Sequence, residues 1–144
     1  MHWTIAPFNG LSTADLHDVL RLRCAVFVVE QRCIYPDVDG QDPVARHVLG
    51  RTADGALVAY ARTLPGTPPH IGRVVVAPAH RGRGLATEVM RRAMHDIEQR
   101  FGSARMAVAA QTYLEPFYAR LGFQRTGPDY DWDGIPHVDM VRPA

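Results

Sequence analysis

The feature that most constrains this chain is a run of β-branched residues that leads through a glycine-rich turn into an amphipathic helix. Residues 71–77 form that run, and Pro78 ends it. From Gly84 to Phe101, apolar residues recur at steps of four, the spacing of a helix with one buried face. A continuous β-branched run is typical of a central strand. The segment therefore predicts a sheet with a helix packed against it.

Short apolar runs elsewhere in the chain predict further strands. The ranges expected to form them are 3–8, 47–50, 56–63, 105–109, 123–126 and 137–142. Asp54-Gly55, between the second and third of these, is a strong hairpin signal. Residues 113–121 are expected to form a short helix that ends at Gly122. This order indicates a mixed α/β domain rather than a regular βαβ repeat.

A first helix is expected near Ser12, because Ser12 and Asp15 form a helix-start pattern. The side chains expected to face the core are Leu16, Leu20, Cys24 and Phe27, which recur every three or four residues. The β-branched stretch 26–29 could equally end this helix early. Residues 33–43 contain proline, glycine and three aspartates, and they are expected to form a loop.

Length and composition exclude several classes of protein. The 144 residues suit one domain spanning 1–144, and 47% apolar with 22% charged residues is ordinary for a globular chain. A net charge of +1 predicts neither nucleic acid nor a membrane as partner, and no apolar run approaches the ~18 residues of a membrane span. No signal-peptide pattern is visible, so we expect a cytoplasmic protein with Cys24 and Cys33 reduced. All 16 basic residues are arginine, which excludes lysine chemistry.

The turn between the central strand and its helix is the candidate for chemistry. Backbone N–H groups converge at a helix start and the helix dipole adds positive charge, so this turn predicts a phosphate site. The residues that would form it are Arg81, Gly82, Arg83, Gly84, Leu85, Ala86 and Thr87. The glycines let the backbone approach a diphosphate, the arginines add donors, and the threonine offers a hydroxyl. The alternative is a plain glycine-rich turn with solvated arginines.

Two other nucleotide motifs are excluded at this turn. The P-loop pattern requires a lysine, which the chain lacks. The dinucleotide fingerprint requires a third glycine where this chain has Thr87.

Residues 81–86 read Arg-Gly-Arg-Gly-Leu-Ala and match the Q/R-x-x-G-x-G/A signature of GNAT N-acetyltransferases. Residues 117–123 resemble the late helix-turn of that family, with its tyrosine. More narrowly, the chain resembles the bacterial ElaA-like subgroup. The segments that carry this resemblance are 20–23, 26–31, 71–76 and 133–137. The resemblance implies a single α/β domain with a mixed, strongly twisted sheet flanked by helices, and acetyl-CoA as cosubstrate.

The resemblance also assigns cofactor contacts. In this family the pantetheine arm enters where two parallel strands splay apart, here the strands ending at Ala77 and Ala109. The strand residues implied to meet the thioester and pantetheine are Val74, Val75 and Val76, and the turn of residues 81–87 would hold the pyrophosphate. A strand N–H that bonds the thioester oxygen can contribute ~3 kcal/mol in the transition state. Gln111 stands where many members have a cofactor-binding asparagine.

Tyr118 is the implied general acid. When an amine attacks acetyl-CoA, sulfur leaves as a thiolate, and a phenol with a pKa of about 10 can protonate it at neutral pH. The alternative is a tyrosine that only packs between Phe117 and Leu121.

Three residues are candidate bases for the acceptor. An alkyl amine with a pKa of about 10.4 is mostly protonated at pH 7, so freeing it costs roughly 4–5 kcal/mol. Glu30, among apolar neighbours, is expected to be partly buried with a raised pKa. His137 follows a rigid Gly-Ile-Pro turn, and His47 is a weaker third candidate. For each, the alternative is a structural hydrogen bond.

A cluster of aspartates raises the question of a metal. Asp37, Asp39 and Asp42 resemble the start of a calcium loop, but the EF-hand pattern fails after Gly40 and lacks its last glutamate. We expect a solvated loop that borders the substrate mouth, and no metal.

The predicted reaction is direct transfer of an acetyl group from acetyl-CoA to a primary amine of a small molecule or peptide, without an acyl-enzyme. One alternative is a non-catalytic acyl-CoA-binding or sensing domain. The other is a generic nucleotide-phosphate binder. The resemblance also allows a homodimer, since dimers are common in that family.

Overall fold

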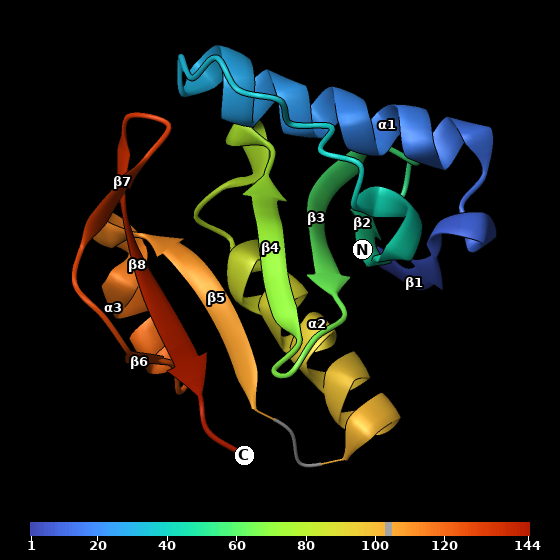
Figure 1. The fold of residues 1–144 in the computed structure, drawn as a ribbon. Helices are drawn as coiled ribbons and strands as arrows, with labels where there is room; N and C mark the ends of the chain where they lie inside the picture. The colour runs from blue at the N-terminus through green and yellow to red at the C-terminus, as the bar shows by residue number, and fades with distance from the viewer. Residues whose placement is uncertain (103–104) are drawn as a thin grey trace.

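The strands of the protein form one mixed sheet in the order β1-β2-β3-β4-β5-β8-β6, with β7 paired to β8 (Figure 1). This computed structural model describes residues 1–102 and 105–144. The strands are β1 (His2–Pro7), β2 (Arg46–Arg51), β3 (Leu57–Leu64), β4 (His70–Val76), β5 (Met106–Gln111), β6 (Gln124–Arg125), β7 (Tyr130–Trp132) and β8 (Ile135–Arg142). Every expected strand is confirmed with slightly shifted ends. The three-residue β7 was not predicted.

The helices follow the expected order. They are α1 (Thr13–Arg23), η2 (Cys24–Glu30), α2 (Leu85–Phe101) and α3 (Glu115–Arg120), with short turns η1 (Phe8–Gly10), η3 (Asp42–Val44), η4 (Pro78–His80) and η5 (Thr112–Leu114). The predicted start of α1 is confirmed, because Ser12 Oγ accepts from the Asp15 N–H at 2.9 Å and Asp15 Oδ2 accepts from the Ser12 N–H at 3.1 Å.

The sheet opens between its two central strands. β4 and β5 are parallel, and their recorded pairing is confined to His70 opposite Ala107, where the Ala107 N–H donates to Pro69 O at 3.0 Å. Beyond that point the two strands diverge (Figure 1). The splay that the family resemblance implies is therefore present, and it leaves backbone groups along β4 without a neighbouring strand.

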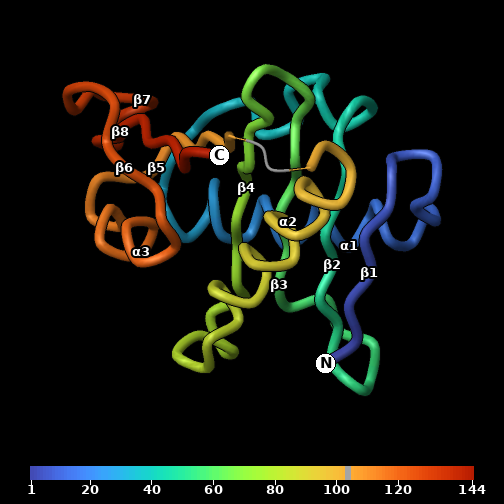
Figure 2. The backbone as a smooth tube through the Cα atoms, turned by 90° about the horizontal axis from the view of Figure 1, so that it is seen from below, coloured from blue at the N-terminus to red at the C-terminus, as the bar shows by residue number. Residues whose placement is uncertain are grey.

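Two apolar clusters cover opposite faces of the sheet. One joins α2 and the α3 region to the sheet and includes Ile71 and Tyr118. The other joins α1 and η2 to the opposite face and includes Leu49 and Val75. Figure 2 shows α2 crossing one face of strands β2 to β4, with α1 behind them. Both faces of the central strands are buried, as their β-branched composition indicates.

The inward face of α1 differs in part from the predicted one: Phe27 packs against the second cluster as expected, whereas Leu16 and Leu20 are only half-buried. Its buried side chains, continuing into η2, are Val19, Leu22, Arg23 and Val26, whereas Cys24 is exposed. The error has a physical cause: Arg23 is buried because aspartates neutralise it, and a periodicity count treats arginine as outward-facing. The stretch 26–29 does not end the helix either, since residues 24–30 continue it as a wider π-helix.

Among the described residues, no helix has the length and apolar character needed to cross a membrane.

Candidate active site

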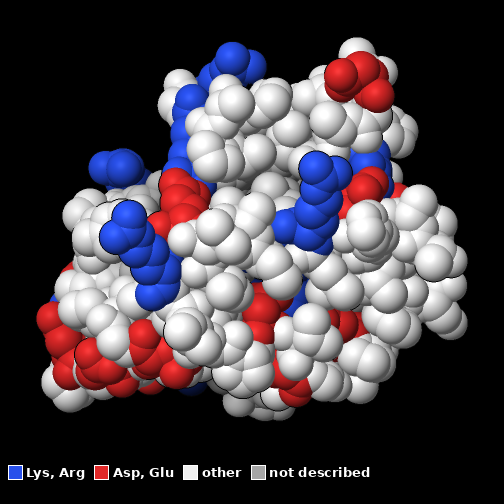
Figure 3. All heavy atoms as spheres, turned by 90° about the horizontal axis from the view of Figure 1, so that it is seen from above, with Lys and Arg blue, Asp and Glu red and all other residues white. Residues whose placement is uncertain are grey.

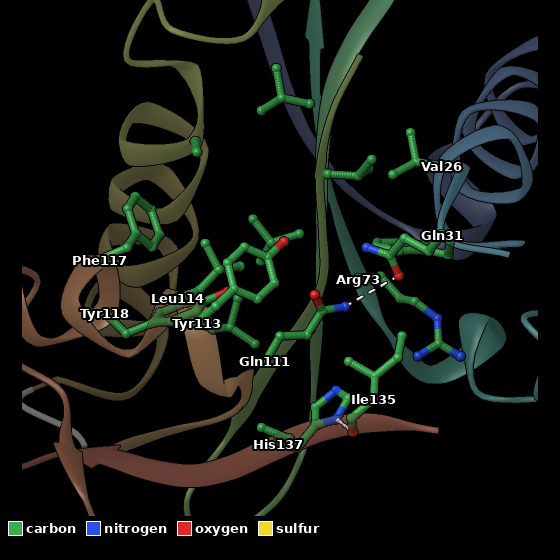
Figure 4. A pocket seen from close by; sticks show the side chains of 18 of the residues that line it. Val26, Gln31, Arg73, Gln111, Tyr113, Leu114, Phe117, Tyr118, Ile135 and His137 are labelled. Carbon is green, nitrogen blue, oxygen red and sulfur yellow. Dashed lines mark hydrogen bonds between the residues drawn. The ribbon is translucent and has the colours of Figure 1, made fainter. Parts of the chain in front are cut away.

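A cavity of about 790 Å³ lies where β4 and β5 separate. Its walls come from η2, both splayed strands, the turn before α2, the α3 region and the β7–β8 hairpin. Figure 4 shows side chains from these elements converging on it. The predicted site residues on its wall are Glu30, Val74, Val75, Val76, Arg81, Gly82, Gly84, Leu85, Ala86, Thr87, Gln111, Tyr118 and His137. Arg83 and the weaker candidate base His47 are predicted residues outside this lining.

The turn at the start of α2 has an open backbone. Gly82 and Gly84 have φ values of +76° and +78°, which side-chain-bearing residues rarely adopt. A Cβ built on either glycine would meet nothing within 4 Å. The glycines are therefore required for backbone conformation, and the space beside them is free for a ligand. Gly84 caps α2, so the first N–H groups of that helix face this space without helical partners.

Arg81 links the turn to η2. Its guanidinium donates two hydrogen bonds to the Glu30 carboxylate, both at 2.6 Å, and its Nε donates to Val76 O at 3.0 Å. The prediction of a buried Glu30 with a raised pKa was wrong. Glu30 is exposed, and the hydrogen bonds from Arg81 lower the pKa of its carboxyl. A carboxylate held in this way is a poor proton acceptor at neutral pH.

Tyr118 lies in α3 with its ring packed edge-on against Phe117 and Phe123. It is 7% exposed, and burial raises the pKa of its phenol to about 12. The described residues provide no hydrogen-bond partner for the hydroxyl. The phenol therefore stays protonated at neutral pH, and its proton remains available to a group inside the cavity.

His137 lies opposite Gln111 in the β5–β8 pairing. Its Nδ1 is 2.7 Å from Ile135 O (Figure 4). A carbonyl oxygen can only accept, so Nδ1 carries the hydrogen, and in the neutral ring Nε2 is the acceptor. Tyr130 stacks on the imidazole, and Trp132 packs against it with ring centroids 5.2 Å apart. This arrangement fixes the tautomer that a base requires.

Gln111 does not point freely toward a cofactor. Its Nε2 donates to Gln31 Oε1 at 3.2 Å, across the cavity (Figure 4). This bond joins β5 to the residue that follows η2.

His47 is not part of the cavity wall. Its ring is fully buried, with Nδ1 2.6 Å from Tyr60 Oη and Nε2 3.0 Å from Asp42 O. Burial lowers the pKa of this imidazole. Both ring nitrogens already have hydrogen-bond partners. His47 therefore has a structural role, which is the alternative to a base that the sequence analysis gives.

A ring of ion pairs beside the cavity was not predicted. Three arginines and three aspartates alternate around it: Arg23, Asp37, Arg73, Asp39, Arg62 and Asp42, and back to Arg23. Successive nitrogen–oxygen distances are 2.9, 3.0, 3.4, 2.6, 2.9 and 2.7 Å. Its members come from α1, β3, β4 and the loop of residues 37–42. We call this set the Arg–Asp ring.

The Arg–Asp ring corrects the interpretation of the aspartates. Asp37 and Asp42 are buried, so this part of the loop is not solvated. The described residues contain no group of three or more His, Cys, Asp or Glu placed to hold a metal. One sequence signal could have found the ring: Arg62 lies inside a buried strand, where an arginine requires a carboxylate partner.

The outer surface beside α1 carries both signs of charge. Figure 3 shows arginine and acidic side chains interspersed on this face, around white surface of uncharged residues. Much of the local charge is therefore compensated by neighbours.

Comparisons with known proteins agree with this geometry. A family model described as an acetyltransferase (GNAT) domain matches residues 29–143. Escherichia coli ElaA is 39% identical over 148 residues, covering 99% of this chain and 96% of ElaA. Its crystal structure matches with a TM-score of 0.94 over 99% of both chains.

Two further relatives extend this similarity. An acyl-CoA N-acyltransferase from Pseudomonas aeruginosa matches with a TM-score of 0.93 at 36% identity, over 99% of both chains. A Schizosaccharomyces pombe protein is 43% identical over 136 residues, covering 92% of this chain and 91% of its own. The expected fold, a mixed sheet flanked by helices, is confirmed.

Proposed function

The chain belongs to the GNAT family of acetyltransferases, and from that premise we propose that it moves the acetyl group of acetyl-CoA directly to a primary amine. The observation that carries the proposal is the cavity between β4 and β5, which meets the open α2 turn at one end and Tyr118 and His137 along its walls.

The residues present fit coenzyme A. The turn offers unpaired N–H groups and open space beside Gly82 and Gly84, which suits a diphosphate. The unpaired edge of β4 suits the amides of a pantetheine arm, because such amides can hydrogen-bond to a free strand edge. Arg81 is already engaged by Glu30, so the backbone rather than that guanidinium supplies the main contacts.

Tyr118 is the proposed acid. The amine nitrogen forms a bond to the thioester carbon, the carbon–sulfur bond breaks, and the leaving sulfur takes the phenolic proton. A raised pKa keeps that proton in place until sulfur develops negative charge. The phenolate then regains its proton from the solvent or the base.

His137 is the proposed base. Its Nε2 is the free acceptor once Nδ1 donates to Ile135 O, and it receives the proton that the amine loses. Glu30 is the weaker candidate, because Arg81 holds both of its oxygens.

The acceptor is proposed to be a small molecule or a peptide with a primary amine, in the cytoplasm. Both cysteines are free thiols, which accords with a reducing compartment.

An amine-library screen tests the function. Purified protein is incubated with acetyl-CoA and each amine, and both free thiol and acceptor mass are measured. We expect coupled thiol release and acetylation for at least one class of amine. Calorimetric binding of acetyl-CoA without acetylation of any amine would favour a sensing domain, and the absence of binding would refute the assignment of the cavity.

A further inference from the structure

Arg73 has an unusual backbone conformation next to the proposed thioester site. Its φ is +51°, in the left-handed region that residues other than glycine, asparagine and aspartate rarely enter. The β3–β4 register shifts here: Tyr60 pairs with Val75, but Arg62 pairs with Gly72. Arg73 therefore belongs to a β-bulge, which bends a strand and redirects the groups that follow it.

The side chain of Arg73 is tied to the loop of residues 37–42. Its Nε lies 3.0 Å from Asp37 Oδ1, and its Nη2 donates to Asp37 O at 3.1 Å. The guanidinium also lies over the Tyr35 ring, 5.2 Å from the centroid. In Figure 4, this side chain points away from Tyr118, toward the outer wall of the cavity. Its contacts therefore hold the bulge from outside.

Asp37 is itself fixed from the opposite side. Arg23 Nε donates to its Oδ2 at 2.9 Å, and Arg23 Nη2 donates to its backbone oxygen at 2.7 Å. Tyr35 adds a hydroxyl hydrogen bond to Oδ1. Asp37 is 4% exposed, so it connects the buried arginine of α1 rigidly to the bulge of β4.

We propose that Asp37 is a positioning residue for acetyl transfer: it holds Arg73 in the left-handed bulge and so aims the backbone of residues 74–76 into the cavity. The proposal rests on the proposed function, because those residues are where the thioester would lie. Strained backbone of this kind persists only where the surroundings enforce it, and here the Arg–Asp ring supplies the constraint.

Two variants of Arg73 distinguish the effect of the bulged backbone conformation from the effect of losing the side chain. Arg73→Gly and Arg73→Ala both remove the guanidinium and leave the Asp37–Arg23 pair intact. Glycine adopts a φ of +51° freely, whereas alanine resists it. We expect Arg73→Ala to lower kcat/KM for acetyl-CoA about tenfold and Arg73→Gly to lower it no more than about threefold. Equal losses would overturn the proposal.

A double-mutant cycle tests Asp37 directly. Asp37→Asn alone is expected to lower kcat/KM about tenfold. In the Arg73→Gly background, the same change should lower the melting temperature through the loss at Arg23 and leave kcat/KM within twofold. The same kinetic loss in both backgrounds would mean that Asp37 acts only through overall stability. If Asp37→Asn does not fold, the Gly–Ala comparison decides alone.

A measurement without turnover keeps this proposal distinct from the proposed function. The backbone amide resonances of Val74, Val75 and Val76 should shift in Arg73→Ala and remain near their original positions in Arg73→Gly. Such shifts together with a failure of the wild-type protein to acetylate any amine would refute the enzyme and retain the bulge constraint. Unchanged resonances in Arg73→Ala would refute the constraint itself.

Discussion

The turn of residues 81–87 and the Arg–Asp ring border the same cavity, yet they hold their shape by different means. The turn depends on backbone: two glycines with positive φ shape it, and its polar groups remain open. The Arg–Asp ring depends on charged side chains that come from four segments, and most of these side chains are buried. A change in the turn should therefore act locally on a ligand. A change in the ring leaves a buried charge behind and should act on the whole fold.

Arg23→Ala should expose this difference most strongly. It leaves Asp37 and Asp42 buried with one partner fewer each, and removing one member of a buried ion pair costs about 3–5 kcal/mol of unfolding free energy. Urea denaturation measures the loss. Arg21→Ala is the matched control, because Arg21 is exposed on the same helix and its loss should cost less than about 0.5 kcal/mol. Similar stabilities of the two variants would mean that the ring contributes little.

Tyr118→Phe should instead lower the rate of catalysis strongly and leave the affinity for the ligand nearly unchanged. Removing the proton donor is expected to lower kcat about 100-fold, the smaller end of general-acid effects. The affinity for coenzyme A should stay within about twofold, since the aromatic packing is retained. Steady-state kinetics measure kcat, and calorimetry measures the affinity for coenzyme A. Unchanged turnover would mean that Tyr118 only packs against its neighbours and is not the acid.

Gly84→Glu tests the backbone site. The new carboxylate would lie in the open space beside the turn, repel a diphosphate and strain a backbone with a φ of +78°. We expect coenzyme A to bind about thirtyfold more weakly, equivalent to about 2 kcal/mol. Gly84→Asn is the control, because asparagine tolerates positive φ and carries no charge. Full affinity in the glutamate variant would place the phosphates elsewhere.

These two regions also differ in how far sequence alone predicts them. The turn is local: strand, glycines and helix start are consecutive, so their geometry follows from a short motif. The ring joins residues far apart, such as Arg23 with Asp37 and Arg73 with Asp37, separated by 14 and 36 positions. No periodicity indicates such partners. For the same reason the periodicity predicts that Cys24 faces inward, because it does not show that Arg23 takes the buried position.

Acidification from neutral pH should first reduce the stability of the region around the Arg–Asp ring. Burial lowers the pKa of His47 and of His70, so each imidazole is harder to protonate in the folded protein than in the unfolded chain, where it takes up a proton near pH 6.5. Stability present above that pH is lost as the pH falls, and we expect a loss of about 1–2 kcal/mol between pH 7.5 and 5.5. Thermal unfolding across this range measures it, and a flat profile would contradict the prediction.

A second acid transition should follow below about pH 4. Hydrogen bonds from Arg62 lower the pKa of Asp39; at Asp42, burial favours a higher pKa but is outweighed by Arg23 and Arg62. Both carboxylates stabilise the fold above the unfolded-state pKa, and that stabilisation disappears as they are protonated. Unfolding at pH 3 should therefore be easier than at pH 5.

Glu30→Gln is expected to have the smallest effect, and it decides between two roles for that residue. The Glu30–Arg81 pair is exposed, so its loss should cost less than about 1 kcal/mol of stability. Without Glu30, the charge of Arg81 is no longer compensated beside the phosphate site, and coenzyme A should bind up to about threefold more tightly at low salt. Because Glu30 accepts two hydrogen bonds from Arg81, the pH dependence of kcat should be unchanged. A hundredfold fall in kcat at neutral pH, with His137→Gln harmless, would instead make Glu30 the base and would move the acceptor toward η2.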